Sequence, residues 1–306
     1  MMKFWWFLSE MVKKTEQLFK YFPPSDNAIK NLQNNVIYCQ HYSKYNDPFE
    51  FWNHIYDGIP DPIEEPERFS AALKEWGMDG CDPNDSDLNA YFDECKDYQP
   101  PFEKMRDSIR LACFASDDDN MLMWSYYADG LRGFCIVFDE PHFLNDDEQA
   151  YVLDVRYQQE PPTIDSFVYA IASDQEWYNQ VAIEETQAKL QYFGDLHNEQ
   201  SMIPLYEKYG ALAEEQMKKI WQDVFAVKPI EWNYENERRL LVHTNSFDDK
   251  PISYPYPRSS VREVILGERM DSNFKDQILS IINTHYPKVV IKTAKRAKNQ
   301  YSIVIE

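Results

Sequence analysis

The stretch that decides the fold runs from Leu111 to Asp139 and reads LACFASDDDNMLMWSYYADGLRGFCIVFD. Its first part, 111–114, carries no charge, and its last part, 133–138, is apolar throughout, which is typical of strands buried on both faces. Between them, Asp119 or Asn120 can cap a helix, because either side chain accepts hydrogen bonds from the first backbone N–H groups. We therefore expect a strand, a short helix and a second strand in the core.

The patterns on either side of this stretch predict an α+β fold with a mixed, largely antiparallel sheet. We expect one domain over residues 1–306, with an acidic helical cap inserted at 57–101 and a helical hairpin inserted at 166–225, since apolar residues recur there at spacings of three and four. Strands are expected at 36–39, 150–157, 238–243, 261–266, 288–295 and 301–305, and further helices at 9–21, 25–32 and 273–285.

The overall composition excludes several classes of protein. The chain of 306 residues has 52 acidic and 31 basic residues, a formal charge of −21, which argues against broad nucleic-acid binding. Five cysteines without a CxxC pair indicate reduced thiols and a cytoplasmic protein. The N-terminal apolar run at 4–8 is too short for a membrane span, although it can dock on a protein partner.

Four motifs are similar to those of a known group. They are FKYFPP (Phe19 to Pro24), YNDPFE (Tyr45 to Glu50), MWSYYADGLRGFCIVFD (Met123 to Asp139) and KPIEWNYENERRL (Lys228 to Leu240). With these motifs the chain resembles, over about residues 18–300, the bacterial family known only as domain of unknown function 2971. That family has no established activity, so the resemblance implies a grouping and leaves the function open.

The sharpest candidate for chemistry is the pair Glu235 and Glu237, which precedes an apolar strand. Alternation along a strand places both carboxylates on one face, where their repulsion can raise one pKa. This Glu-x-Glu also resembles the third motif of the ADP-ribosyltransferase superfamily. The resemblance implies that Glu237 holds the nicotinamide ribose of NAD and stabilises an oxocarbenium-like transition state, while Glu235 activates the acceptor. Alternatively, the two glutamates pair with Arg238, Arg239 or Lys228 in a surface network.

The same resemblance implies the rest of an NAD site. The superfamily's first motif is a His or Arg on an early strand, where this chain has Lys20 and Tyr21, and its middle motif is left open among Ser116, Ser125 and Tyr127. The aromatic side chains would shape the cleft, and Arg132 or Arg238 would meet the pyrophosphate. The candidate NAD-binding residues are Lys20, Tyr21, Asn46, Asp47, Trp124, Ser125, Tyr127, Arg132 and Arg238.

Two further acidic motifs are better explained by a structural role than by ligand binding. Asn46 and Asp47 can form a side-chain turn before Pro48, or alternatively line a cleft and bind a ribose. The run 117–119 suits a helix N-terminus better than a calcium loop. The six histidines form no metal-binding cluster, so we expect no metal.

Three functions remain open. The first is an ADP-ribosyltransferase-like enzyme, with toxins and phage-defence effectors as settings that the resemblance suggests. The second is a non-catalytic protein-interaction or sensor module, and the third is a metal-dependent nuclease using Asp47, Glu50 and Glu237. Catalysis by a nucleophilic side chain lacks a motif, since the sequence offers only Cys39 beside His41.

Overall fold

The computed structural model describes residues 17–75, 82, 84–95, 100–144, 147, 149–194 and 200–306. The chain divides into two compact units. Both segments predicted as insertions, 57–101 and 166–225, fall within unit 2. Unit 1 comprises Met1–Phe51, Glu103–Glu160 and Ala226–Glu306, and unit 2 comprises Trp52–Phe102 and Pro161–Phe225.

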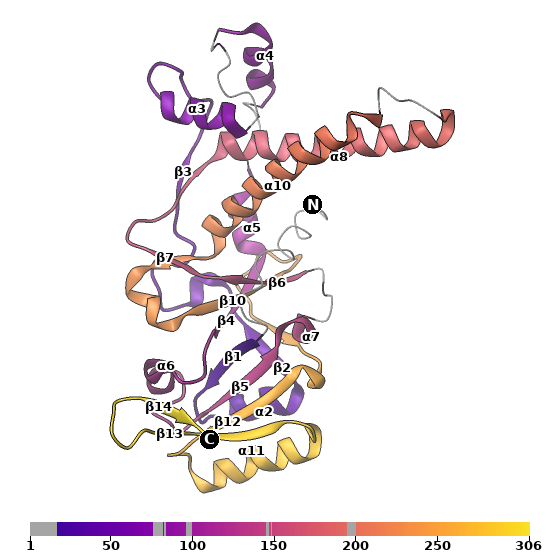
Figure 1. Ribbon diagram of the computed structural model, residues 1–306. Coiled ribbons are helices and arrows are strands. Elements are labelled where there is room, and N and C mark those ends of the chain that lie inside the picture. The colour runs from indigo at the N-terminus through magenta and orange to yellow at the C-terminus, as the bar shows by residue number, and fades with distance from the viewer. Residues whose placement is uncertain are drawn as a thin grey trace. The chain divides into compact units, whose positions relative to one another are not determined.

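An eight-stranded sheet forms the centre of unit 1, in the order β14-β13-β12-β5-β1-β4-β10-β6 (Figure 1). Only β12 and β13 pair in parallel, and the other neighbours are antiparallel, so the predicted α+β class with a mixed, largely antiparallel sheet is confirmed. The strands are β1 (Gln17–Phe22), β4 (Ile109–Ala115), β5 (Phe134–Asp139), β6 (Ala150–Asp154), β10 (Glu237–His243), β12 (Val261–Gly267), β13 (Val290–Arg296) and β14 (Ile303–Ile305). Two further strand pairs are β2 (Val36–Cys39) with β11 (Ile252–Pro255), and β7 (Arg156–Gln158) with β9 (Val227–Pro229).

The central stretch folds as predicted, into β4, helix α6 (Met121–Tyr126) and β5. Asn120 caps α6, because its Oδ1 accepts hydrogen bonds from the backbone N–H groups of Leu122 at 3.0 Å and Met123 at 3.2 Å. Gly133 precedes β5, and a Cβ atom there would lie 1.9 Å from the carbonyl oxygen of Phe22. The close approach of the two strands therefore requires glycine.

The helix predicted at 9–21 is wrong where the structure describes it, because residues 17–22 form β1 and pair with β5 along the whole strand. Pairing between two buried strands outweighed the local helical pattern. Residues 9–16 and the possible docking segment at 4–8 lie outside the described residues. The strand predicted at 150–157 is interrupted at Val155, where β6 ends and β7 begins.

The two faces of the sheet carry different side chains. Face 1 presents Leu18, Phe114 and Leu240, which pack against α2, α7 and α11. Face 2 presents Tyr21 and Ala115, which pack against α6. Successive side chains of a strand alternate in direction, so Arg238 lies on face 1, whereas Glu237 and Arg239 lie on face 2. The remaining helices of unit 1 are α2 (Asp26–Asn34), η1 (Tyr42–Lys44), α5 (Phe102–Ser108, whose first residue belongs to unit 2), α7 (Glu140–Leu144), η2 (Ile230–Glu235), η3 (Arg258–Ser260) and α11 (Ser272–His285).

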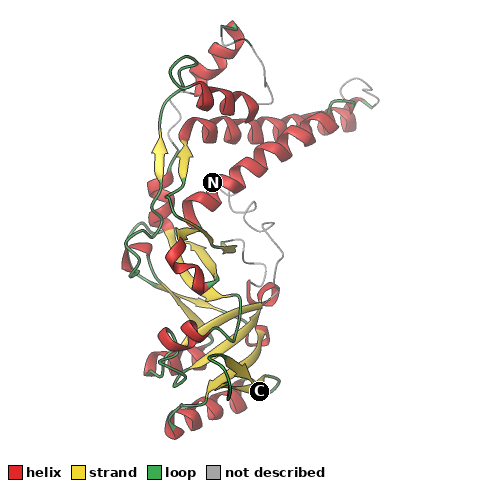
Figure 2. Cartoon of the chain, turned by 60° about the vertical axis from the view of Figure 1, so that its left-hand side comes forward, coloured by secondary structure: helices red, strands yellow, loops and turns green. Residues whose placement is uncertain are grey.

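Unit 2 is largely helical, and its longest elements α8 and α10 run side by side as a hairpin (Figure 2). Phe167 and Ile171 of α8 pack with Phe69 of α3 and Phe92 of α4 in a separate apolar core. A parallel pair of short strands, β3 and β8, precedes the hairpin. The elements are β3 (His54–Tyr56), α3 (Pro66–Glu75), α4 (Ser86–Cys95), β8 (Thr163–Asp165), α8 (Ser166–Phe193) and α10 (Ile203–Phe225).

Candidate functional site

The two glutamates of the Glu-x-Glu motif meet around one lysine. Lys228 Nζ lies 2.8 Å from Glu235 Oε2 and 2.8 Å from Glu237 Oε2. Glu235 ends the short helix η2, and Asn236 then adopts the left-handed conformation (φ 41°, ψ 52°) before β10 begins. Asn tolerates this conformation better than most residues. The carboxylates therefore converge through a turn, and not through the strand alternation that the sequence predicted.

Arg239 extends this network to the second predicted motif. Its Nε lies 3.0 Å from Glu237 Oε1, and its Nη1 lies 2.8 Å from Glu50 Oε1. Asp47, three residues before Glu50, is also buried. Its Oδ1 accepts a hydrogen bond from the backbone N–H of Phe49 at 2.9 Å. Asp47 Oδ2 and Glu50 Oε2 are buried and make no hydrogen bond with the described residues. We call Glu50, Arg239, Glu237, Lys228 and Glu235 the ion network.

The ion network is buried. The predicted alternative, pairing of the two glutamates with arginine or lysine, is correct for Lys228 and Arg239, but its location on the surface is wrong. Glu237 is 3% exposed and Arg239 is 0% exposed. Burial by itself would raise the pKa of Glu237, but the charges of Arg239 and Lys228 outweigh it and hold that pKa at about 2. Burial raises the pKa of Glu50. Glu237 is thus ionised at neutral pH and Glu50 is biased toward its neutral form.

Aromatic side chains adjoin the ion network. The Tyr127 hydroxyl donates a hydrogen bond to Glu235 Oε1, and the Tyr157 hydroxyl accepts one from the backbone N–H of Glu237 at 2.8 Å. Lys228 Nζ lies 5.1 Å from the centre of the Trp232 ring. Outside this layer Tyr126 is 70% exposed, and its ring lies 6.3 Å from that of Tyr234. These rings offer apolar faces to a planar ligand.

Other predicted residues lie apart from the ion network. Arg238 is on face 1, paired with Glu140 at 2.6 Å and Asp154 at 2.8 Å. Lys20 Nζ donates to the carbonyl oxygen of Cys113 at 2.6 Å and lies 5.4 Å from the Phe114 ring. The structure thus brings together Glu235, Glu237 and Tyr127, and places Arg238 on the opposite face of the sheet.

The remaining predicted residues have contacts of their own. Tyr21 is on face 2, where its hydroxyl donates to the carbonyl oxygen of Asp117 at 2.9 Å. Trp124 is buried against Tyr21, with ring centres 5.2 Å apart. Ser125 is exposed and donates to the carbonyl oxygen of Met121 at 2.7 Å. Asn46 is exposed. Arg132 Nη1 lies 3.7 Å from Asp129 Oδ1.

The sequence analysis named Lys228 and Arg239 as partners of the two glutamates, but it placed them on the surface and missed that Glu50 joins them. The signal was present: charged residues recur inside apolar segments, as in ENERRLLV at 235–242, where a buried strand tolerates charge only if it is paired. The pairing of Glu50 with Arg239 could not be predicted from the sequence, because the two residues are far apart in the chain.

The described residues contain no group of three or more His, Cys, Asp or Glu side chains suited to hold a metal ion. In the ion network, the cations beside Glu237 are the side chains of Lys228 and Arg239. Two cationic side chains thus lie among the three carboxylates of the ion network. No helix in the described part of the chain is long and apolar enough to cross a membrane.

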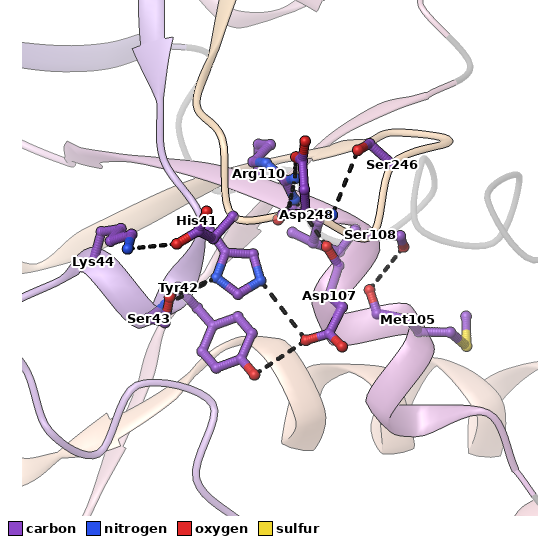
Figure 3. Close-up of polar contacts among 12 residues, drawn as sticks. His41, Tyr42, Ser43, Lys44, Met105, Asp107, Ser108, Arg110, Ser246 and Asp248 are labelled. Carbon is purple, nitrogen blue, oxygen red and sulfur yellow. Dashed lines mark hydrogen bonds and ion pairs between the residues drawn. The ribbon is translucent and has the colours of Figure 1, made fainter.

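A second polar cluster of unit 1 surrounds η1 and the end of α5 (Figure 3). His41 Nδ1 is 2.8 Å from Ser43 Oγ, and His41 Nε2 is 3.7 Å from Asp107 Oδ1. Arg110 fastens the end of α5 by donating from Nη1 to the carbonyl oxygen of Asp107 at 2.8 Å and from Nε to that of Lys250 at 2.6 Å. We call His41, Tyr42, Ser43 and Asp107 the His41 cluster.

In comparisons with known proteins, part of the chain matches one protein family. Searches of curated proteins and of solved structures each found no match. A family model described as "Protein of unknown function (DUF2971)" matches residues 123–240, a segment that begins in α6 and ends in β10. It includes Tyr127 and four members of the ion network, Lys228, Glu235, Glu237 and Arg239, but not Glu50. Over these residues the resemblance to the domain-of-unknown-function family 2971, predicted from the sequence, is confirmed.

Proposed function

We propose that this protein is an ADP-ribosyltransferase-like enzyme that acts on NAD through Glu237. The bond between C1′ of the nicotinamide ribose and the nicotinamide nitrogen breaks, and nicotinamide leaves with the bonding electrons. Glu237 stabilises the positive charge that develops on the ribose. A nucleophile of the acceptor then bonds to C1′, and its proton passes to Glu235. A bacterial toxin or phage-defence effector acting in the cytoplasm is the setting that this proposal implies.

The observation that carries the proposal is the convergence of Glu235 and Glu237 on Lys228 in a buried centre beside Tyr127. Buried charges are costly, and they concentrate at functional sites. The pKa of Glu237, at about 2, keeps the carboxylate ionised, as the stabilising role requires. Asp47 Oδ2 and Glu50 Oε2 can accept hydrogen bonds from ribose hydroxyl groups. Because Glu237 is 3% exposed, the proposal includes an outward movement of Tyr127 and Trp232 when NAD binds.

The test follows nicotinamide release and ADP-ribose labelling when the purified full chain is incubated with NAD and a cell lysate. We expect Glu237→Gln to lower nicotinamide release roughly 100-fold or more, because a neutral amide cannot balance the ribose charge. Glu140→Gln is the matched control, since Glu140 also pairs with an arginine of β10 but on face 1. Equal release by the wild type and Glu237→Gln, or a folded wild type that does not bind NAD, would overturn the proposal.

A second candidate function is a non-catalytic protein-interaction module, and the helical hairpin of unit 2 favours it. Tyr192 is 83% exposed, Phe193 is 71% exposed and Trp177 is 59% exposed. Trp177 also lines a groove of about 480 Å³ together with Tyr178, Met202 and Tyr206, among others. Exposed aromatic rings around a groove are typical of surfaces that bind another protein.

A further inference from the structure

The contacts of His41 define which of its ring nitrogens carries a proton. His41 precedes η1, and its Nδ1 accepts a hydrogen bond from the backbone N–H of Ser43 at 3.3 Å. An acceptor nitrogen of a neutral imidazole is unprotonated, so the proton is on Nε2. The Ser43 hydroxyl, 2.8 Å from the same Nδ1, therefore donates to it (Figure 3). This is the arrangement of a serine beside a general base.

The other side of the imidazole faces a carboxylate. His41 Nε2 lies 3.7 Å from Asp107 Oδ1, close enough for electrostatic attraction but beyond hydrogen-bond distance, and the Tyr42 hydroxyl donates to the same oxygen at 3.2 Å. The Tyr42 ring also packs on His41, with ring centres 4.3 Å apart. Asp107 can thus stabilise the imidazolium that forms when His41 takes up a proton, and Tyr42 helps to hold the ring in place.

Exposure distinguishes the base from the nucleophile. His41 is buried, whereas Ser43 is exposed. The charged groups acting on His41 are Asp107, Arg110, Asp249 and Lys44. Burial, followed by the charge of Arg110, lowers the pKa of His41 below 6.5, so the ring is neutral and able to accept a proton at pH 7.

We propose that Ser43 is a nucleophile that reacts with esters of small carboxylic acids, with His41 as its general base and Asp107 as a positioning residue. Ser43 Oγ attacks the carbonyl carbon, the new C–O bond forms, and the hydroxyl proton passes to His41 Nδ1. The ester C–O bond then breaks, and the alcohol leaves with that proton. Water attacks the acyl-serine with the same help from His41, which releases the acid and restores Ser43. This site is separate from Glu237 and does not depend on the ADP-ribosyltransferase proposal.

The test uses the full chain with p-nitrophenyl acetate, measuring p-nitrophenolate release, and with a fluorophosphonate probe, whose attachment is located by peptide mass spectrometry. We expect the label on Ser43, and a rate lowered roughly 100-fold in Ser43→Ala and in His41→Gln, because general base catalysis contributes about that much. Ser272→Ala, at an exposed serine that begins α11, should leave the rate unchanged.

The pH profile separates chemistry from structure. The wild-type rate should fall only below about pH 6.5, where His41 becomes protonated. In Asp107→Asn the midpoint of this fall should move to lower pH, because the imidazolium loses a neighbouring negative charge. Labelling of Ser43→Ala as fast as the wild type, or a label on another residue, would overturn the proposal. So would a His41→Gln variant that melts at the wild-type temperature and reacts at the wild-type rate.

Discussion

The ion network of unit 1 and the helical hairpin of unit 2 depart from ordinary packing in opposite ways. In the ion network, five ionisable side chains are buried, whereas at the end of α8 the rings of Tyr192 and Phe193 are exposed to water. Each arrangement costs stability, through desolvated charge in one case and exposed apolar surface in the other. Proteins keep such departures mainly where function requires them. The comparison therefore supports the two functions proposed above, chemistry at the ion network and protein binding at the hairpin.

The largest effect on stability is expected from a substitution that disrupts the ion network. Arg239→Met leaves Glu237 and Glu50 buried without their shared partner, so we expect it to lower the free energy of unfolding by about 3–5 kcal/mol. Arg262→Met is the control, since Arg262 makes a half-exposed ion pair with Asp139 and should lose at most about 1 kcal/mol. Urea denaturation measures both. Equal losses in the two variants would mean that the network is as well hydrated as the surface.

Acid should weaken the ion network through Glu237. Its pKa is about 2 in the folded protein against an ordinary 4.5, so its contribution is present above pH 4.5 and is lost as the pH falls toward 2. Glu50 acts in the opposite sense, because its raised pKa gives stability at low pH that is lost as the pH rises. The unfolding free energy of Glu237→Gln should therefore vary less between pH 5 and 3 than that of the wild type. Identical slopes would contradict the assignment.

The smallest effect on stability is expected at the hairpin. Replacing the exposed rings in Tyr192→Ser with Phe193→Ser should change the unfolding free energy by no more than about 0.5 kcal/mol, since neither ring is buried. The same variant should bind less of a dye that reports exposed apolar surface. Phe167→Ala, in the buried core of unit 2, is the contrasting control and should lose about 3–5 kcal/mol. A large loss in the double variant would show that the rings are packed within the protein.

Helices and strands were predicted correctly wherever their formation depends on the residues of one segment alone. The helices at 166–193 and 272–285 and the strands β4 and β5 follow the apolar spacing and the cap at Asn120. The prediction failed at 17–22, where a pattern compatible with a helix forms a central strand because its neighbours are strands. Ser43 was missed as well, since neither its exposure nor the approach of Asp107 can be read from the pattern around His41.

The sequence by itself determined the α+β class and the resemblance to family 2971, and it singled out Glu235 and Glu237 as candidate residues. Those depend on hydrophobic period and on motifs within one segment. Only the tertiary structure decided that Glu237 is buried between Lys228 and Arg239, and that Arg239 reaches Glu50. It also placed Arg238 on the opposite face of β10. The physical reason is that the energy of a charge depends on its partners and its solvent exposure, and distant segments supply both.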